Sequence, residues 1–185
     1  MVTIPPTSIN NDFAIEKTVD CVWSNWTDGE CSVSCGDGTT SQGEFWEAMN
    51  LAGARGLPIC YILQNNQIAL DTPPAKQSGV EIWADKAVAM GFPAWTIDGS
   101  DPAAWHASAA VAREFAMEGG GPTLIHVETM RGCGHAHHHD DLYLGNASGT
   151  PPGYVDRDVL AYWEAKDPIP THRQLLLDLG VDEIA

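Results

Sequence analysis

Apolar and polar positions along the first third of the chain predict a strand, a helix and a second strand in succession. ECSVSC (30–35) has the character of a short strand. From about Ser41 to Gly56, apolar residues at 45, 49 and 52 then form one stripe at helical spacing. LPICYIL (57–63) is a short apolar run, typical of a strand buried on both faces of a parallel sheet.

The same alternation continues to the C-terminus. The predicted elements are a helix near 81–90, a strand at 94–97 (AWTI), a helix from Pro102 to about Met117 capped by Ser100 or Asp101, a strand at 123–130 (TLIHVETM), and short amphipathic helices at 158–165 and 172–180. Strands that alternate with crossover helices predict an α/β fold, with a parallel sheet and helices on both of its faces.

Composition narrows the class of protein. The 185 residues include 25 acidic and 9 basic side chains, a formal net charge of −16, so nucleic acid and anionic membranes would be repelled over most of the surface. No apolar run approaches the ~20 residues that span a bilayer, and the N-terminus lacks the pattern of a signal or transit peptide. We therefore expect a cytoplasmic protein that binds neither nucleic acid nor membrane.

The five cysteines do not predict a cross-linked or zinc-stabilised protein. Their number is odd, two of them fall in a predicted strand and a predicted site loop, and no C-x2-C pair occurs. Neither a disulfide framework nor a zinc site is expected.

Polar clusters follow three of the predicted strands. They are Gly36-Asp37-Gly38-Thr39-Thr40, Gln64-Asn65-Asn66 and Arg131-Gly132-Cys133-Gly134-His135. If the strands are parallel, all three clusters lie on the carboxyl rim of the sheet, where ligands bind in such folds.

Asp37 lies between two glycines beside the start of a helix. Free N–H groups there suit a diphosphate, whose charge a divalent cation would balance. Mg²⁺ takes one or two oxygen ligands from protein and the rest from phosphate and water, so Asp37 and an Asn oxygen from the next strand end are candidate ligands. A glycine-rich turn is also structurally useful without any ligand, and this alternative stays open.

Three stretches resemble the alpha subunits of 2-oxo acid dehydrogenase first components, which bind thiamine diphosphate. They are GDGTTSQGEFWEAMNLAGARGLPICYILQNNQIALDTP, ADKAVAMGFPAWTIDGSDPAAW and GPTLIHVETMRGCGHAHHHDD, and the likeness extends over about residues 33–180. The resemblance implies Asp37, Asn66 and the carbonyl of Ile68 as Mg²⁺ ligands. It further implies cofactor contacts from Gly36, Gly38, Thr39 and Arg131, and a catalytic role for His135.

The resemblance also implies the reaction and its partners. A 2-oxo acid would be decarboxylated and its acyl group passed to a lipoyl-bearing acyltransferase. A beta-type subunit would supply the pyrimidine-binding domain and its glutamate, while Glu44 and Glu47 would be exposed helix carboxylates. Residues 31–185 would form the pyrophosphate-binding domain after an atypical segment, 1–30. Because that segment is shorter than in the family, we expect an N-terminally truncated chain with an incomplete sheet.

Three alternatives stay open. WSNWTDGECSVSCGDG (23–38) looks like the start of a thrombospondin type 1 repeat, a small extracellular module. The chain could also be a non-catalytic remnant or interaction module that keeps the fold. Finally, HAHHHDD (135–141) could bind a transition metal, although a loop over the diphosphate site using His135, with or without His137, explains it as well.

Overall fold

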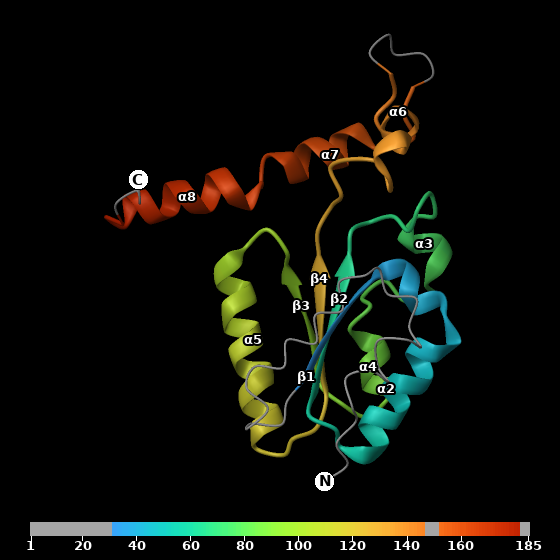
Figure 1. Ribbon diagram of the computed structural model, residues 1–185, viewed down its shortest axis with the longest axis vertical. Coiled ribbons are helices and arrows are strands. Elements are labelled where there is room, and N and C mark those ends of the chain that lie inside the picture. The colour runs from blue at the N-terminus through green and yellow to red at the C-terminus, as the bar shows by residue number, and fades with distance from the viewer. Residues whose placement is uncertain (1–30, 147–151, 182–185) are drawn as a thin grey trace.

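The computed structural model describes residues 31–146 and 152–181, which form a four-stranded sheet with helices packed on it (Figure 1). The strands are β1 (Cys31–Gly36), β2 (Ile59–Asn65), β3 (Ala94–Asp98) and β4 (Thr123–Glu128). Their order across the sheet is β1-β2-β4-β3, and every neighbouring pair is parallel. The predicted α/β class with a parallel sheet is confirmed.

Helices cover both faces of this sheet, as predicted. On one face lie α2 (Gly43–Arg55) and the short α4 (Asp85–Ala89), and on the other lies α5 (Pro102–Met117) (Figure 1). Asp101 caps α5 by accepting hydrogen bonds from the backbone N–H groups of Ala103 and Ala104 at 2.9 and 3.2 Å. The cap is therefore Asp101 rather than Ser100.

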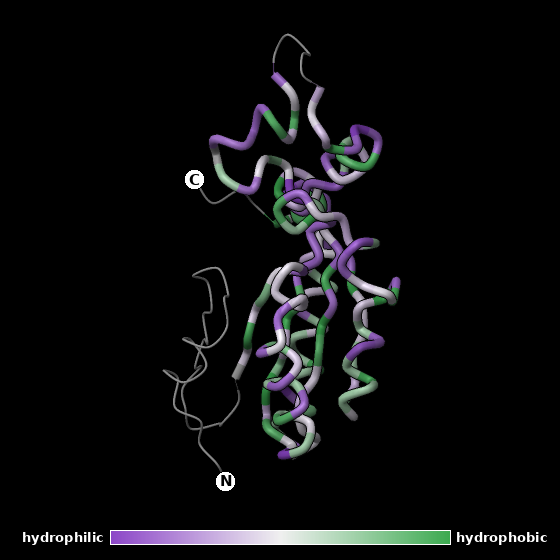
Figure 2. Tube along the Cα trace, turned by 90° about the vertical axis from the view of Figure 1, so that its right-hand side faces the viewer, coloured by the Kyte–Doolittle hydropathy of each residue, from purple (hydrophilic) through white to green (hydrophobic). Residues whose placement is uncertain are grey.

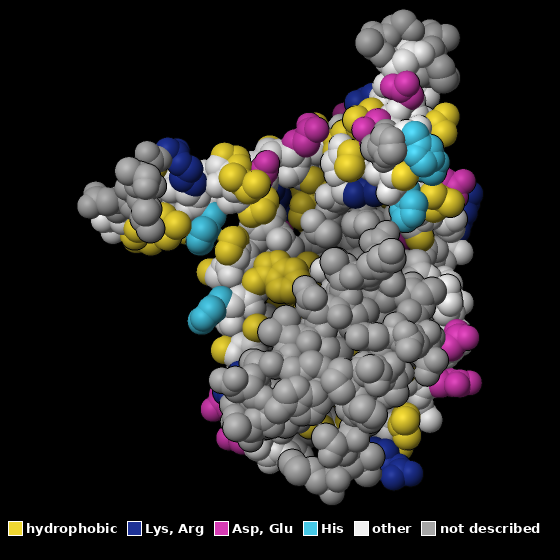
Figure 3. All heavy atoms as spheres, viewed as in Figure 1, with side chains coloured by type: hydrophobic (Ala, Val, Ile, Leu, Met, Phe, Trp, Pro, Cys, Tyr) yellow, Lys and Arg dark blue, Asp and Glu magenta, His cyan; other side chains and the backbone are white. Residues whose placement is uncertain are grey.

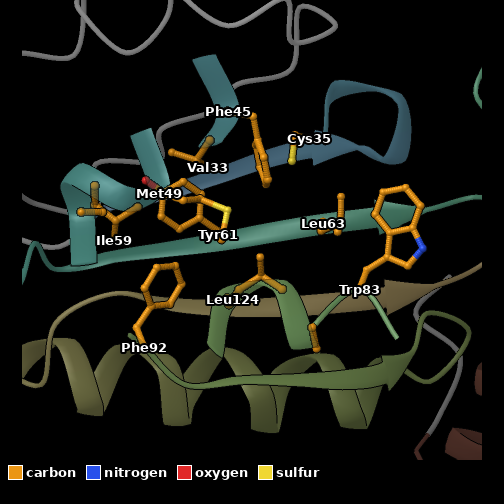
Figure 4. Packing of buried hydrophobic residues seen from close by; sticks show 13 residues of the cluster. Val33, Cys35, Phe45, Met49, Ile59, Tyr61, Leu63, Trp83, Phe92 and Leu124 are labelled. Atoms are coloured by element: carbon orange, nitrogen blue, oxygen red, sulfur yellow. The ribbon is translucent and has the colours of Figure 1, made fainter. Parts of the chain in front are cut away.

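The larger part of the core lies between the sheet and the α2/α4 layer (Figure 4). The predicted helix stripe supplies Phe45, Met49 and Ala52, all buried. Tyr61 and Leu124 meet them from the strands, and the Phe45 and Tyr61 rings lie 6.4 Å apart at 77°. A smaller cluster on the opposite face joins α5 to β3 and β4. In Figure 2 the apolar positions accordingly concentrate in the strands and the inner sides of these helices.

The expectation that the second strand is buried on both faces is wrong. Its side chains alternate between buried and partly accessible: Tyr61 and Leu63 are buried, whereas Cys60 and Ile62 are half-buried and Gln64 is exposed. Helix α5 contacts β2 as well as β3 and β4, and Cys60 and Ile62 pack against the cluster beneath it, but it covers this second face of β2 only in part.

Short helices gather at the carboxyl edge of the sheet, most of them not predicted. They are the 3-10 helices η1 (Asp37–Ser41) and η2 (His137–His139), the single-turn helices α3 (Pro74–Gln77) and α6 (Asp140–Tyr143), and the predicted α7 (Arg157–Glu164) and α8 (Pro168–Asp178). Helix α8 buries none of its residues and extends away from the sheet, with hydrophobic side chains on its surface (Figures 1 and 3).

Within the described residues, no helix is both long and apolar enough to cross a membrane. The atypical segment 1–30, and with it the first half of the thrombospondin-like stretch, lies outside the described residues.

Candidate functional site

The register of the strands brings the three predicted polar clusters to one edge of the sheet. Gly36 pairs with Gln64 across β1 and β2, and Asn65 pairs with Glu128 across β2 and β4. The chain therefore leaves all three strands at the same level. Beyond the strands, the N–H of Arg131 donates to the carbonyl oxygen of Asn66 at 3.4 Å. The prediction of a shared carboxyl rim is confirmed.

The turn after β1 packs directly against the loop after β2. A methyl group at Gly38 would lie 2.9 Å from the Cβ of Ala69, so only glycine allows the two segments to approach this closely. In the loop, Gln67 has a φ of 73°, and the Oδ1 of Asn66 accepts the N–H of Ile68 at 3.3 Å. A non-glycine residue with positive φ is uncommon and is found where surrounding contacts fix the backbone.

Asp37 is buried at the base of this site, with only 2% of its surface exposed. Its Oδ2 accepts a hydrogen bond of 2.7 Å from the Nε2 of Gln77 in α3. The hydroxyl of Thr40 donates to the Asp37 carbonyl oxygen at 2.8 Å and so holds the η1 turn closed. Burial raises the pKa of Asp37, although the Gln77 hydrogen bond, backbone N–H groups and the charge of Arg131 oppose the rise. A cation at the carboxylate would remove this cost of burial.

Arg131 reaches the same region from the end of β4. Its Nη2 donates to the carbonyl oxygen of Leu70 at 2.6 Å and to the hydroxyl of Tyr154 at 2.8 Å. Its Nε and Nη1 are buried and have no hydrogen-bond partner among the described residues. Buried donors without a partner are rare, so two unpartnered guanidinium nitrogens here are evidence for an anionic ligand.

His135 is exposed on the loop that follows β4, and no hydrogen bond of the described chain connects it to Asp37, Asn66 or Arg131. The loop turns back on itself because the N–H of Gly134 donates to the Oδ1 of Asp140 at 2.7 Å. The structure thus brings together the turn after β1, the loop after β2 and Arg131, and leaves His135 at the surface.

A transition-metal site in the 135–141 histidine run has no support among the described residues. No three histidine, cysteine, aspartate or glutamate side chains of the described chain converge on a point that could hold a metal. Asp140 instead closes the loop. A magnesium site would need different donors, because Mg²⁺ prefers carboxylate, amide and carbonyl oxygens together with phosphate and water.

Several other residues have structural roles, and the exposure of Glu44 and Glu47 on a helix was predicted. Glu44 and Glu47 are exposed on α2. Trp46 packs against the core, and its indole N–H donates to the carbonyl oxygen of Thr40 at 2.9 Å. His126 is fully buried on β4, with its Nδ1 3.0 Å from the Thr96 hydroxyl, and burial lowers its pKa to about 4.

Sequence reasoning missed Gln77, Tyr143 and Tyr154. Gln77 touches the Asp37 carboxylate, while Tyr143 and Tyr154 contact Arg131. Gln77 comes 40 residues after Asp37, and Tyr154 comes 23 after Arg131, in segments without a periodic pattern. No local signal in the sequence identifies them, because their roles arise only when distant loops meet at the rim.

The other half of the carboxyl edge is closed by α7. Lys166, just after this helix, forms an ion pair with Asp98 at the end of β3 and lies 4.8 Å above the Trp163 ring. A cavity of about 240 Å³ remains between the ends of β3 and β4 and helix α7, lined by residues that include Ser100, Thr129 and Leu160. The ion pair thus ties the C-terminal helices to the sheet.

Comparison with known proteins gives consistent results. A family model described as the dehydrogenase E1 component matches residues 24–183. The pyruvate dehydrogenase E1 component subunit alpha of Bacillus cereus is 43% identical over 146 residues, and those of Bacillus subtilis (strain 168) and Staphylococcus aureus (strain COL) are 42% and 39% identical. Each alignment covers 79% of this chain but 37% of the relative, so the chain spans well under half the length of these relatives.

Among solved structures, one from Mycobacterium smegmatis, assigned to the thiamin diphosphate-dependent enzymes, is similar with a TM-score of 0.43 and 21% identity. The likeness covers 54% of this chain and 18% of that one. A TM-score this low does not define a shared fold.

Proposed function

Because the chain belongs to the dehydrogenase E1 component family, we propose that it forms the diphosphate- and Mg²⁺-binding half of a thiamine diphosphate-dependent 2-oxo acid dehydrogenase. Residues 31–185 are the pyrophosphate-binding domain in this proposal. One observation carries it: the sheet edge combines the buried carboxylate of Asp37 with the guanidinium of Arg131, in which two buried nitrogens have no partner among the described residues.

In this proposal Mg²⁺ binds to the side-chain oxygens of Asp37 and Asn66 and to the carbonyl oxygen of Ile68. Two observations support the fit. The raised pKa of Asp37, caused mainly by burial, favours a site in which a cation stabilises the charged form. The close contact of Gly38 with Ala69 places the two ligand-bearing segments against each other. Gln77, through its bond to Oδ2, would orient the carboxylate.

The diphosphate lies, in this proposal, against the turn after β1 and the side chain of Arg131. Backbone N–H groups of Gly36, Gly38 and Thr39 are suitable donors to phosphate oxygens, since glycines allow an anion to approach the backbone closely. The Nε and Nη1 of Arg131 would complete the contact with charge-assisted hydrogen bonds.

The cofactor, when bound, supplies the thiazolium carbon and electron sink for decarboxylation of a 2-oxo acid. This chain's contribution is to hold the diphosphate and to present His135, exposed at the entrance, to substrate. A beta-type subunit would supply the pyrimidine-binding half, and a lipoyl-bearing acyltransferase would accept the acyl group. The names of the bacillar and staphylococcal relatives favour pyruvate within this substrate class. A cytoplasmic location remains a prediction.

A binding titration tests the proposal. We expect thiamine diphosphate with Mg²⁺ to quench tryptophan fluorescence and to raise the melting temperature, with a larger effect when a beta-type subunit is present. A ligand at 100 times its dissociation constant stabilises the folded state by ~2.7 kcal/mol, or roughly 5–10 °C for a chain of this size. No response with or without the partner would leave the chain a non-catalytic module with this fold.

A further inference from the structure

Tyr154 connects the proposed diphosphate site to the segment that follows α6. Its hydroxyl accepts the N–H of Arg131 Nη2 at 2.8 Å and donates to the Leu70 carbonyl oxygen at 3.0 Å. Arg131 Nη2 donates to the same Leu70 oxygen at 2.6 Å. One hydroxyl therefore ties the end of β4 to the loop after β2.

Tyr154 itself is held firmly against α6. Its N–H donates to the Leu142 carbonyl oxygen at 3.2 Å. The N–H of the next residue, Val155, donates to the Tyr143 carbonyl oxygen at 3.1 Å. The preceding residue has to be glycine here, because a Cβ at Gly153 would lie 2.1 Å from the Tyr143 oxygen. The backbone that presents the Tyr154 hydroxyl is thus fixed by contacts on both sides.

Tyr143 supports the same guanidinium from below. The carbon at the centre of the Arg131 guanidinium lies 4.6 Å from the centre of the buried Tyr143 ring, and the Tyr143 hydroxyl donates to the Arg131 carbonyl oxygen at 2.9 Å. The rings of Tyr143 and Tyr154 meet edge to face at 5.3 Å. Arg131 is therefore held at three points: its carbonyl oxygen, one face of its guanidinium and its Nη2.

These contacts determine where the remaining donors of Arg131 point. A guanidinium is planar, so fixing Nη2 and the ring face also fixes the directions of the Nε and Nη1 hydrogens. Those two nitrogens are buried and have no partner among the described residues. A donor pair held in place before binding loses little side-chain entropy when an anion arrives.

We propose that Tyr154 is a positioning residue, which orients the remaining N–H groups of Arg131, on Nε and Nη1, for contact with the diphosphate of the cofactor. The inference rests on the proposed function and deepens it, because Tyr154 acts on the ligand only through Arg131.

The test compares Tyr154→Phe with the full wild-type chain in the presence of a beta-type subunit. Titration calorimetry measures the dissociation constants of thiamine diphosphate and of inorganic pyrophosphate, each with saturating Mg²⁺. Because Tyr154 acts only through Arg131, its loss should cost about as much as one ordinary hydrogen bond, or roughly three- to tenfold weaker binding of both ligands. Tyr162→Phe is the matched control, since its exposed hydroxyl accepts from Lys166 Nζ at 3.3 Å on α7, and it should bind as wild type does.

A double-mutant cycle separates positioning from a general structural role. Arg131→Met keeps the aliphatic stem, and in this background Tyr154→Phe should cause no further loss of binding. If circular dichroism shows that Arg131→Met is unfolded, Arg131→Lys replaces it, because one ammonium cannot reproduce the planar fork that contacts Tyr154 and an anion together. An undiminished effect of Tyr154→Phe in the second background would overturn the inference.

The failures of the two proposals are distinguishable. If wild type binds neither ligand with Mg²⁺, the proposed function is wrong and the inference is lost with it. If wild type binds both and Tyr154→Phe binds them equally well, the inference alone is overturned.

Discussion

Replacing Gly38 by alanine tests whether the turn after β1 and the loop after β2 are as closely packed as described. The added methyl group would lie 2.9 Å from the Cβ of Ala69. Carbon atoms in good contact are about 3.5–4.0 Å apart, so one of the two segments has to move by roughly 0.6–1.1 Å. Gly38 does not have a positive φ, and the effect is therefore steric rather than a matter of backbone strain.

Overpacking of this kind costs about 1–3 kcal/mol of stability. For a chain of this length, 1 kcal/mol shifts the melting temperature by about 2–4 °C, which gives a decrease of roughly 2–12 °C. A smaller unfolded-state term, about 0.4–1 kcal/mol, favours alanine over glycine wherever the native backbone permits it.

Gly36→Ala is the matched control because it shares that unfolded-state term without the clash. Nothing lies within 4 Å of a methyl group at Gly36, where φ is −79° and ψ is 164°. Urea unfolding followed by circular dichroism gives the free energy for both variants and wild type. The difference between the two variants, about 1–3 kcal/mol, isolates the contact with Ala69.

The result that would refute this reasoning is equal stability of Gly38→Ala and Gly36→Ala. Such a result would mean that the loop holding Asn66 can move away at no cost, and the argument for a prearranged pair of metal-ligand segments would fail with it. We also expect Gly38→Ala to weaken binding of thiamine diphosphate and Mg²⁺, since the displaced turn carries donor N–H groups.

Three further predictions follow from burial. Asp37→Asn should lose the stabilisation that Mg²⁺ and thiamine diphosphate give to wild type. Without ligand at pH 7 it should melt at a higher temperature than wild type, because burial raises the pKa of Asp37 and its charged form destabilises the folded state above that pKa. A lower melting temperature would contradict this. The pKa of His126 falls from 6.5 to about 4, so unfolded chains take up a proton that the folded state resists, and about 3 kcal/mol of stability should be lost as pH drops from 7 to 4. His126→Leu should reduce that loss by a similar amount in urea unfolding at the two pH values, whereas an unchanged pH dependence would refute it. Burial and the charge of Asp37 raise the pKa of the Cys35 thiol to about 12, so peptide mapping after brief iodoacetamide treatment at pH 8 should find exposed Cys133 alkylated and Cys35 intact.

The order of the main elements could be predicted from the sequence because each has its own local signal. The stripe at Phe45, Met49 and Ala52 is buried as expected, and Asp101 and Pro102 do start a helix. The degree of burial of β2 could not be predicted in this way. Its half-covered residues Cys60 and Ile62 depend on where α5 lies, which is a tertiary property.

The residues of the candidate site also differ in how far the sequence could predict them. Asp37, Asn66 and Arg131 could be placed on one rim in advance because parallel strands end together. The partners that hold them could not be predicted, since Gln77 and Tyr154 contact them across loops whose paths follow no periodic pattern. Single-turn helices such as α3 and α6 were missed for the same reason, because four residues are too few for a helical period to appear.

Helix α8 has a thermodynamic consequence of its own. It contributes no residue to the core; Ile169 in its first turn is 78% exposed, and Leu179, which caps its C-terminus, is 71% exposed. Its opening would therefore require little free energy compared with global unfolding. Amide hydrogens of residues 170–179 should exchange with deuterium well before those of β2 and β4. Brief digestion with a protease should remove α8 and leave a resistant fragment that ends near Lys166, which forms the ion pair with Asp98.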